Sequence, residues 1–137
     1  MRNLLLYFSI SFISLVSSAQ DCDLQFNGAY VCIPENSSQG FNEFIRFYDN
    51  GEVITSVSVY ELEQSISWFH SEDPGVSQGS YEQVGCDISF STRHDDSKFY
   101  YEGTIEGDFL KLKVLYPGKK KKEMVELMFE FQKTKLK

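Results

Sequence analysis

The sequence predicts an all-β fold, an eight-stranded antiparallel up-and-down (meander) barrel with one short helix between strands 3 and 4. Three observations lead to this prediction. Short runs rich in β-branched and aromatic residues alternate apolar with polar positions along most of the chain. Gly, Asp, Asn, Pro and Ser separate these runs at short intervals. The connections are too short for parallel crossovers, so consecutive strands are expected to pair antiparallel.

Residues 1–19 have the features of a signal peptide. Arg2 is followed by an apolar stretch of 13 residues and then by the small residues Ser17, Ser18 and Ala19. Cleavage near Ala19 would leave residues 20–137 as a single domain, secreted or periplasmic. The alternative is an uncleaved membrane anchor, for which the apolar stretch falls short of the roughly 20 residues that a spanning helix needs.

The composition is that of a folded acidic protein. The chain has a net charge of −7, and loss of Arg2 with the signal peptide leaves −8. This charge argues against a nucleic-acid partner, which would require a basic face. The 12 Phe and 8 Tyr residues suit a packed core. We expect a monomer without a stable membrane anchor after cleavage.

The first strand is predicted at 26–33, and 34–40 is a loop by composition. Residues 41–60 then read as a β-hairpin whose turn is Asp49-Asn50-Gly51. A three-residue loop would place Phe47 opposite Val53, and a two-residue loop would place it opposite Ile54. The first register is expected, because it leaves one face apolar with Glu43 as its only charge.

Residues 61–70 interrupt the alternation. Leu62, Ile66 and Phe69 follow a helical spacing, which predicts a short helix packed against one end of the sheet. A distorted strand is the alternative. Trp68 and Phe69 would then be either a plug at the barrel mouth or a lid over a ligand.

The remaining chain predicts two further hairpins and a final strand. Residues 79–92 form a hairpin with a Gly85-Cys86 turn, and residues 98–116 form one with a Gly107-Asp108 turn. Residues 123–132 alternate strictly and would close the barrel against 26–33. An open, half-rolled sheet covered by the helix is the alternative.

The strand layout also orders the three cysteines. Cys22 and the Gly85-Cys86 turn fall at the same end of a meander, whereas Cys32 falls at the other end. A strand rises about 3.3 Å per residue, which places Cys32 far beyond bridging distance. The hypothesis is a disulfide between Cys22 and Cys86, with Cys32 outside the bridge and facing inward.

The sequence offers little catalytic chemistry. His70 and His94 fall in different turns, and no nucleophile, metal or phosphate motif accompanies them. We therefore predict no enzyme, no cofactor and no metal site. The lysines at 119–122 are expected to form a solvated hairpin tip, and an anionic-surface contact is the alternative.

Several short motifs resemble small secreted lipocalin-like (calycin-type) β-barrel proteins of bacteria. They are Gly28-x-Tyr30, the run IRFYDNGEVI at 45–54, Gly79-Ser80-Tyr81 and YEGTIEGD at 101–108. The resemblance spans about residues 26–132. It implies an up-and-down barrel that can enclose a cavity, and it names no ligand.

Two functions follow as hypotheses. In the first, the barrel binds a small hydrophobic molecule, with Trp68 and Phe69 as a lid. In the second, the barrel is solid and acts through its surface as an envelope accessory, adhesion or inhibitor-type protein. The candidate ligand-lining residues of the first are Tyr30, Phe47, Val57, Tyr81, Phe90, Tyr101, Val114 and Phe129.

Overall fold

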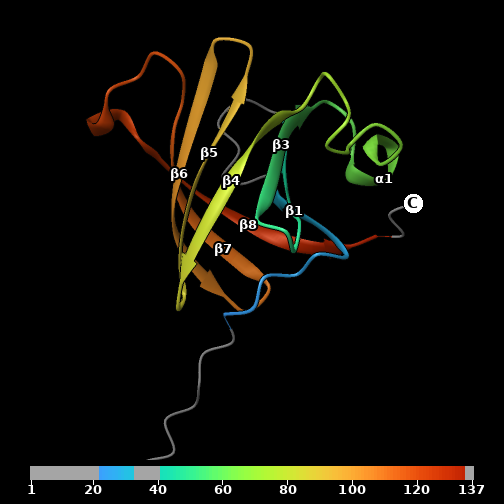
Figure 1. The fold of residues 1–137 in the computed structure, drawn as a ribbon, viewed down its shortest axis with the longest axis horizontal. Coiled ribbons are helices and arrows are strands. Elements are labelled where there is room, and N and C mark those ends of the chain that lie inside the picture. The colour runs from blue at the N-terminus through green and yellow to red at the C-terminus, as the bar shows by residue number, and fades with distance from the viewer. Residues whose placement is uncertain (1–21, 33–40, 135–137) are drawn as a thin grey trace, which may run out of the picture.

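The computed structural model describes residues 22–32 and 41–134, and the predicted signal peptide lies outside these ranges. Eight strands form a closed antiparallel barrel in chain order (Figure 1). The predicted fold class is therefore confirmed. The strands are β1 (Gly28–Cys32), β2 (Asn42–Phe47), β3 (Glu52–Ser58), β4 (Ser77–Val84), β5 (Asp87–His94), β6 (Ser97–Glu106), β7 (Phe109–Leu115) and β8 (Val125–Lys133).

Two short helices accompany the strands. The helix α1 (Leu62–Ser65) lies between β3 and β4, as predicted, and the 3-10 turn η2 (Lys121–Glu123) precedes β8. Within the ranges that the structure describes, no helix is both long and apolar enough to cross a membrane.

The barrel closes through β1 and β8, which pair antiparallel with Tyr30 opposite Phe131. This pairing confirms the closed barrel over the open sheet. Closure leaves no unpaired strand edge along the sheet. The turns that contain Gly51, Gly85 and Gly107 lie at one end of the barrel, which is called the turn end below. The opposite end, where β1 finishes at Cys32, is called the open end.

The β2–β3 hairpin has the predicted register. Phe47 lies opposite Val53 and Glu43 lies opposite Val57. Gly51 has a φ of 91°, which side chains with a Cβ atom rarely adopt, so the three-residue loop requires glycine there. One sequence position thus fixes which side chains of both strands face the interior.

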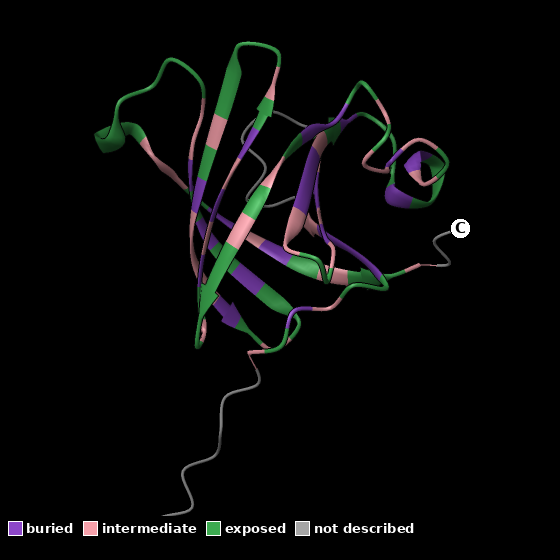
Figure 2. Cartoon of the chain, in the orientation of Figure 1, coloured by how far each residue is buried: buried purple, intermediate pink, exposed green. Residues whose placement is uncertain are grey.

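The other hairpins also match their predicted registers. Tyr81 lies opposite Phe90 across the Gly85-Cys86 turn, and Ile105 lies opposite Leu110 across the Gly107-Asp108 turn. Buried and exposed positions alternate along β7, which appears as alternating bands in Figure 2. This alternation is the expected pattern for a sheet with one face in the core.

Aromatic rings fill the barrel interior towards the turn end. The Phe47 ring contacts those of Tyr30, Tyr81 and Phe90 edge-on, with centroids 5.1–5.6 Å apart. Phe90 in turn stacks on Tyr101 with 4.5 Å between centroids. Such contacts add about 0.5–1.5 kcal/mol per pair beyond area burial. This part of the barrel is a packed core.

The segment before β1 covers the turn end. A disulfide joins Cys22 to Cys86, with the Cα atoms 4.9 Å apart, as predicted. Leu24 belongs to the buried core cluster inside the barrel, and the Gln25 backbone N–H donates to the Tyr30 hydroxyl oxygen over 3.1 Å. The turn end is therefore covered by residues of the N-terminal arm.

The segment around α1 packs on the outer wall of the barrel and not over its mouth, which corrects the expected position. Leu62 and Phe69 join a second buried cluster with the outward-facing Phe44 and Ile54. Figure 1 shows α1 beside the strands. The physical reason is that the outer face of the β2–β3 hairpin carries large apolar side chains, which need a cover.

Arg46 also holds this segment from the outer face of β2. Its Nη1 donates to the Phe69 carbonyl oxygen over 3.2 Å, and its guanidinium lies 4.6 Å from the centre of the Tyr48 ring. A cation over an aromatic ring contributes about 0.5–2 kcal/mol. Arg46 thus links the barrel wall to the loop that carries Trp68 and Phe69.

Two strand glycines, Gly79 on β4 and Gly103 on β6, allow close backbone approach between neighbouring strands. A Cβ atom built on Gly103 would overlap the Lys111 carbonyl oxygen and lie 2.9 Å from the Leu112 Cα. Gly79 stands in the same relation to the Ser91 carbonyl oxygen. These contacts involve backbone atoms, which cannot rotate away, so the close approach of the strands there depends on glycine.

We predict that Gly103→Ala lowers the free energy of unfolding by about 1–3 kcal/mol, because the backbone of β6 or β7 must move. Urea unfolding followed by circular dichroism measures the change. Gly75→Ala is the control, since its nearest neighbour is a side-chain oxygen of Asp73 at 3.1 Å. Equal stabilities of the two variants would contradict the close-approach argument.

Loss of the disulfide is predicted to cost about 4 kcal/mol of stability, because it releases a loop with a sequence separation of 64. Unfolding of a chain of residues 20–137 is compared with that of its double variant Cys22→Ala/Cys86→Ala. Reductant should lower the free energy of unfolding of the parent chain and leave that of the double variant unchanged. A parent protein that is indifferent to reductant, or a peptide map without the Cys22–Cys86 link, would refute the bridge.

Candidate functional site

A cleft of about 260 Å³ opens at the open end of the barrel. Most of its lining residues come from β2, β3 and β6, and β4, β5, β8 and the loop before β4 contribute one residue each. They include the apolar and aromatic side chains of Ile45, Val57, Phe99 and Tyr101. Ile45, Tyr101 and Phe129 also belong to the buried core cluster, so the packed core forms the floor of the cleft.

Glu43 is the carboxyl group of this cleft. The Tyr116 hydroxyl donates to Glu43 Oε1 over 2.8 Å, and the Cys32 thiol also donates to the carboxylate. Burial raises the pKa of Glu43, and these two hydrogen bonds oppose the shift in part. Desolvation dominates because the interior solvates a charge poorly.

The position of Glu43 follows from the hairpin register. Glu43, Ile45 and Phe47 lie at alternate positions of β2, so all three point inward. Glu43 is the one nearest the open end. Because a strand alternates strictly, moving this carboxyl to the surface would turn Ile45 and Phe47 outward as well.

The groups around Glu43 stay protonated at neutral pH. Burial and the nearby Glu43 carboxylate raise the pKa of the Cys32 thiol to about 12. Burial, followed by the same carboxylate, raises the pKa of the Tyr116 hydroxyl. A neutral thiol is a poor nucleophile, so Cys32 acts here as a hydrogen-bond donor.

A second polar group lies on neighbouring strands. The hydroxyls of Thr55 and Thr92 are hydrogen-bonded at 2.9 Å and are both buried. The Tyr101 hydroxyl hydrogen-bonds to both, and burial raises its pKa. Buried polar groups with satisfied partners fix side chains in place, so this network holds the Tyr101 ring at the cleft wall.

Three of the predicted ligand-lining residues reach the cleft, and all of the predicted residues except Val57 belong to the packed core or pack against it. Val57, Tyr101 and Phe129 line the cleft. The others lie in or against the packed core. Those others are Tyr30, Phe47, Tyr81, Phe90 and Val114.

The two residues proposed as a lid lie elsewhere. Phe69 is buried in the outer-wall cluster and Trp68 packs against it, with ring centroids 6.4 Å apart. Neither is among the described residues that line the cleft. The loop that carries them contributes Gly75 to the lining instead, and the first residue of β4, Ser77, follows it there.

The polar turns form no metal site in the part of the chain that the structure describes, where no three His, Cys, Asp or Glu side chains gather.

His94 lies at the cleft, and its Nε2 is 3.5 Å from an Asp95 carboxylate oxygen. Lys119 pairs with Glu123 at 3.9 Å on the exposed segment that contains η2.

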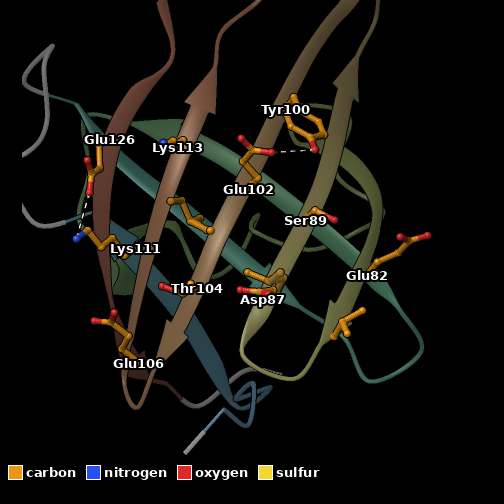
Figure 3. Close-up of a pocket in the computed structure, with 14 residues that line it drawn as sticks. Glu82, Asp87, Ser89, Tyr100, Glu102, Thr104, Glu106, Lys111, Lys113 and Glu126 are labelled. Carbon is orange, nitrogen blue, oxygen red and sulfur yellow. Dashed lines mark hydrogen bonds and ion pairs between the residues drawn. The ribbon is translucent and has the colours of Figure 1, made fainter. Parts of the chain in front are cut away.

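A larger, shallower hollow of about 830 Å³ lies on the outer wall of β4–β8 (Figure 3). Five carboxylates and two lysines line it. Lys111 pairs with Glu126 at 3.3 Å, and the Tyr100 hydroxyl lies 3.4 Å from Glu102 (Figure 3). These groups are exposed to solvent, which weakens their electrostatic effect.

Sequence reasoning identified the inward position of Glu43 without assigning it a role, and it did not select Tyr116, Thr55 or Thr92. The available signal was a lone charge on an otherwise apolar strand face. A buried carboxyl needs partners. Those partners come from strands distant in sequence, so their identity required the closed barrel.

Comparisons with protein-family models, with curated proteins and with solved structures found no match to this chain. The cleft is therefore interpreted from its own geometry.

We predict that Glu43→Gln gains stability relative to the parent protein as the pH rises. The raised pKa means that folding favours the protonated form, so the parent is most stable below the ordinary value of 4.5 and loses stability as the pH rises through the folded pKa. The slope is at most about 1.4 kcal/mol per pH unit.

Urea unfolding between pH ~4 and ~8 measures this difference. Glu130→Gln is the control, because Glu130 lies exposed on β8. The difference between Glu43→Gln and the parent should grow with pH, while that of the control stays flat. Parallel stability curves for Glu43→Gln and the parent would rule out a strained buried carboxylate.

Proposed function

We propose that this chain is an exported, lipocalin-like barrel that binds a small, mostly apolar molecule in the cleft at its open end. The observation that carries the proposal is the hollow of about 260 Å³ inside the mouth of a closed barrel. Apolar walls with a few well-placed polar groups are typical of small-molecule sites. In this proposal the protein binds its ligand and does not transform it.

The packed core limits the ligand's size. Aromatic side chains occupy the interior around Phe47, and Leu24 packs into the same core from the N-terminal arm. The cleft is slightly smaller than the roughly 300–1,000 Å³ of typical ligand pockets. A compact aromatic or short aliphatic molecule therefore fits better than a long lipid chain.

Export of the chain is supported by two independent features. Residues 1–19 have the sequence of a signal peptide, and the Cys22–Cys86 bridge suits an oxidising compartment. The up-and-down barrel is the architecture that the lipocalin-like motifs imply. A monomeric binding protein outside the cytosol is the function that joins these features.

Filling the cleft should weaken ligand binding. Val57 is half-exposed at the mouth and lines the cleft, so Val57→Trp would place an indole where the ligand lies. We expect the affinity for 2-phenylethanol, a small neutral probe, to fall by about tenfold or more, as for a lost apolar contact area. Ligand-observed nuclear magnetic resonance measures the binding.

The matched control is Val84→Trp, which makes the same substitution at an exposed position beside the Gly85-Cys86 turn. It should leave binding unchanged. Native mass spectrometry of the purified parent protein provides a second test, since a tightly held ligand would add mass. Equal binding by the two variants would show that the probe binds outside the cleft.

The alternative function, action through the surface, is favoured by the hollow on the outer wall of β4–β8. Figure 3 shows its exposed carboxylates and lysines on neighbouring strands. Probe binding that Val84→Trp weakens and Val57→Trp spares would favour this wall, because Val84 lines it.

A further inference from the structure

Glu43 has no cationic partner among the residues that the structure describes, where none of the ion pairs includes it. Arg46 lies on the same strand but on the opposite face, and it donates to the Phe69 carbonyl oxygen. The sequence of 33–40, IPENSSQG, contains no Lys, Arg or His. The nearest groups that face Glu43 are neutral donors, namely Tyr116 and Cys32.

These two donors do not occupy all the hydrogen-bond acceptor sites of the Glu43 carboxylate. A carboxylate has about four lone-pair sites, and here it accepts from one hydroxyl and one thiol. Glu43 is also a lining residue of the cleft. A buried charge is costly unless it is paired, so a cation entering the cleft would supply the missing partner.

The other walls suit a cation attached to an apolar body. Phe99, Tyr101 and Phe129 present aromatic rings, and Ile45 and Val57 present aliphatic surface. An ammonium group near an aromatic face gains about 0.5–2 kcal/mol. Burial of the apolar part of the ligand contributes a further, larger share.

An anionic ligand would find no cationic side chain of lysine or arginine in the cleft to pair with. The lining residues include no lysine or arginine, and the one histidine, His94, lies beside the Asp95 carboxylate. A second carboxylate beside Glu43 would be repelled. The net charge of −7 also raises the local concentration of cations around the protein.

Resting on the cleft-binding function above, we propose that the natural ligand is a small organic amine, whose ammonium group pairs with the Glu43 carboxylate while its apolar body lies against the aromatic walls. Tyr116 and Cys32 are positioning residues in this arrangement. They hold the carboxylate towards the cleft through their hydrogen bonds.

Three probes of similar shape test the proposal: 2-phenylethylamine, 2-phenylethanol and 3-phenylpropanoate. They carry a positive, a neutral and a negative group on one aromatic body. Calorimetry with the mature chain at about pH 7.5, where the amine is protonated, measures their affinities. We expect the amine to bind the parent protein about tenfold or more tightly than the alcohol, and the acid to bind most weakly.

Glu43→Gln separates charge from shape. It should bring the amine's affinity to that of the alcohol while the alcohol's own affinity stays within about threefold. Glu130→Gln has the same net charge as Glu43→Gln but keeps Glu43, so it should retain the parent protein's preference for the amine over the alcohol. This control excludes an effect of overall charge.

The outcomes distinguish this proposal from the one on which it rests. Equal affinities of amine and alcohol for the parent, or an amine preference that survives Glu43→Gln, would overturn the amine proposal and leave cleft binding intact. Failure of all three probes to bind the parent would overturn both. An amine preference lost only in Glu43→Gln would support both.

Discussion

The register of the β2–β3 hairpin is the constraint on which the rest of the structure depends. The left-handed backbone at Gly51 fixes Phe47 opposite Val53, and strict alternation then assigns every other side chain of both strands. Phe47 becomes the centre of the aromatic core, and Glu43 becomes the carboxyl at the cleft. A shift of one residue would exchange the two faces and remove both.

The same register explains the covers on the barrel. Phe44 and Ile54 face outward, and the segment around α1 buries them against Phe69. The turn end is covered by the arm that carries Leu24 and is tied by the Cys22–Cys86 bridge. With the turn end covered by this arm, the open end is where the barrel interior meets solvent through the cleft.

The cleft contains a buried carboxylate, Glu43, whose desolvation is unfavourable and which a ligand could contact. Burying Glu43 lowers stability at neutral pH, because desolvation raises its pKa. Packing alone would favour an apolar residue at this position. Functional sites often contain groups that lower the stability of the folded protein. The buried carboxylate of Glu43 at the cleft wall is such a group, and pairing with an amine would give it a role.

The sequence by itself determined the strands, the hairpin registers and the disulfide, because these depend on local alternation, on turn glycines and on strand direction. It also determined that Glu43 faces inward. Only the tertiary structure decided that α1 covers the outer wall and that Tyr116 and Cys32 reach Glu43. The tertiary structure also decided where the packed core ends and the cleft begins. The physical reason is that these contacts join residues distant in sequence, which barrel closure brings together.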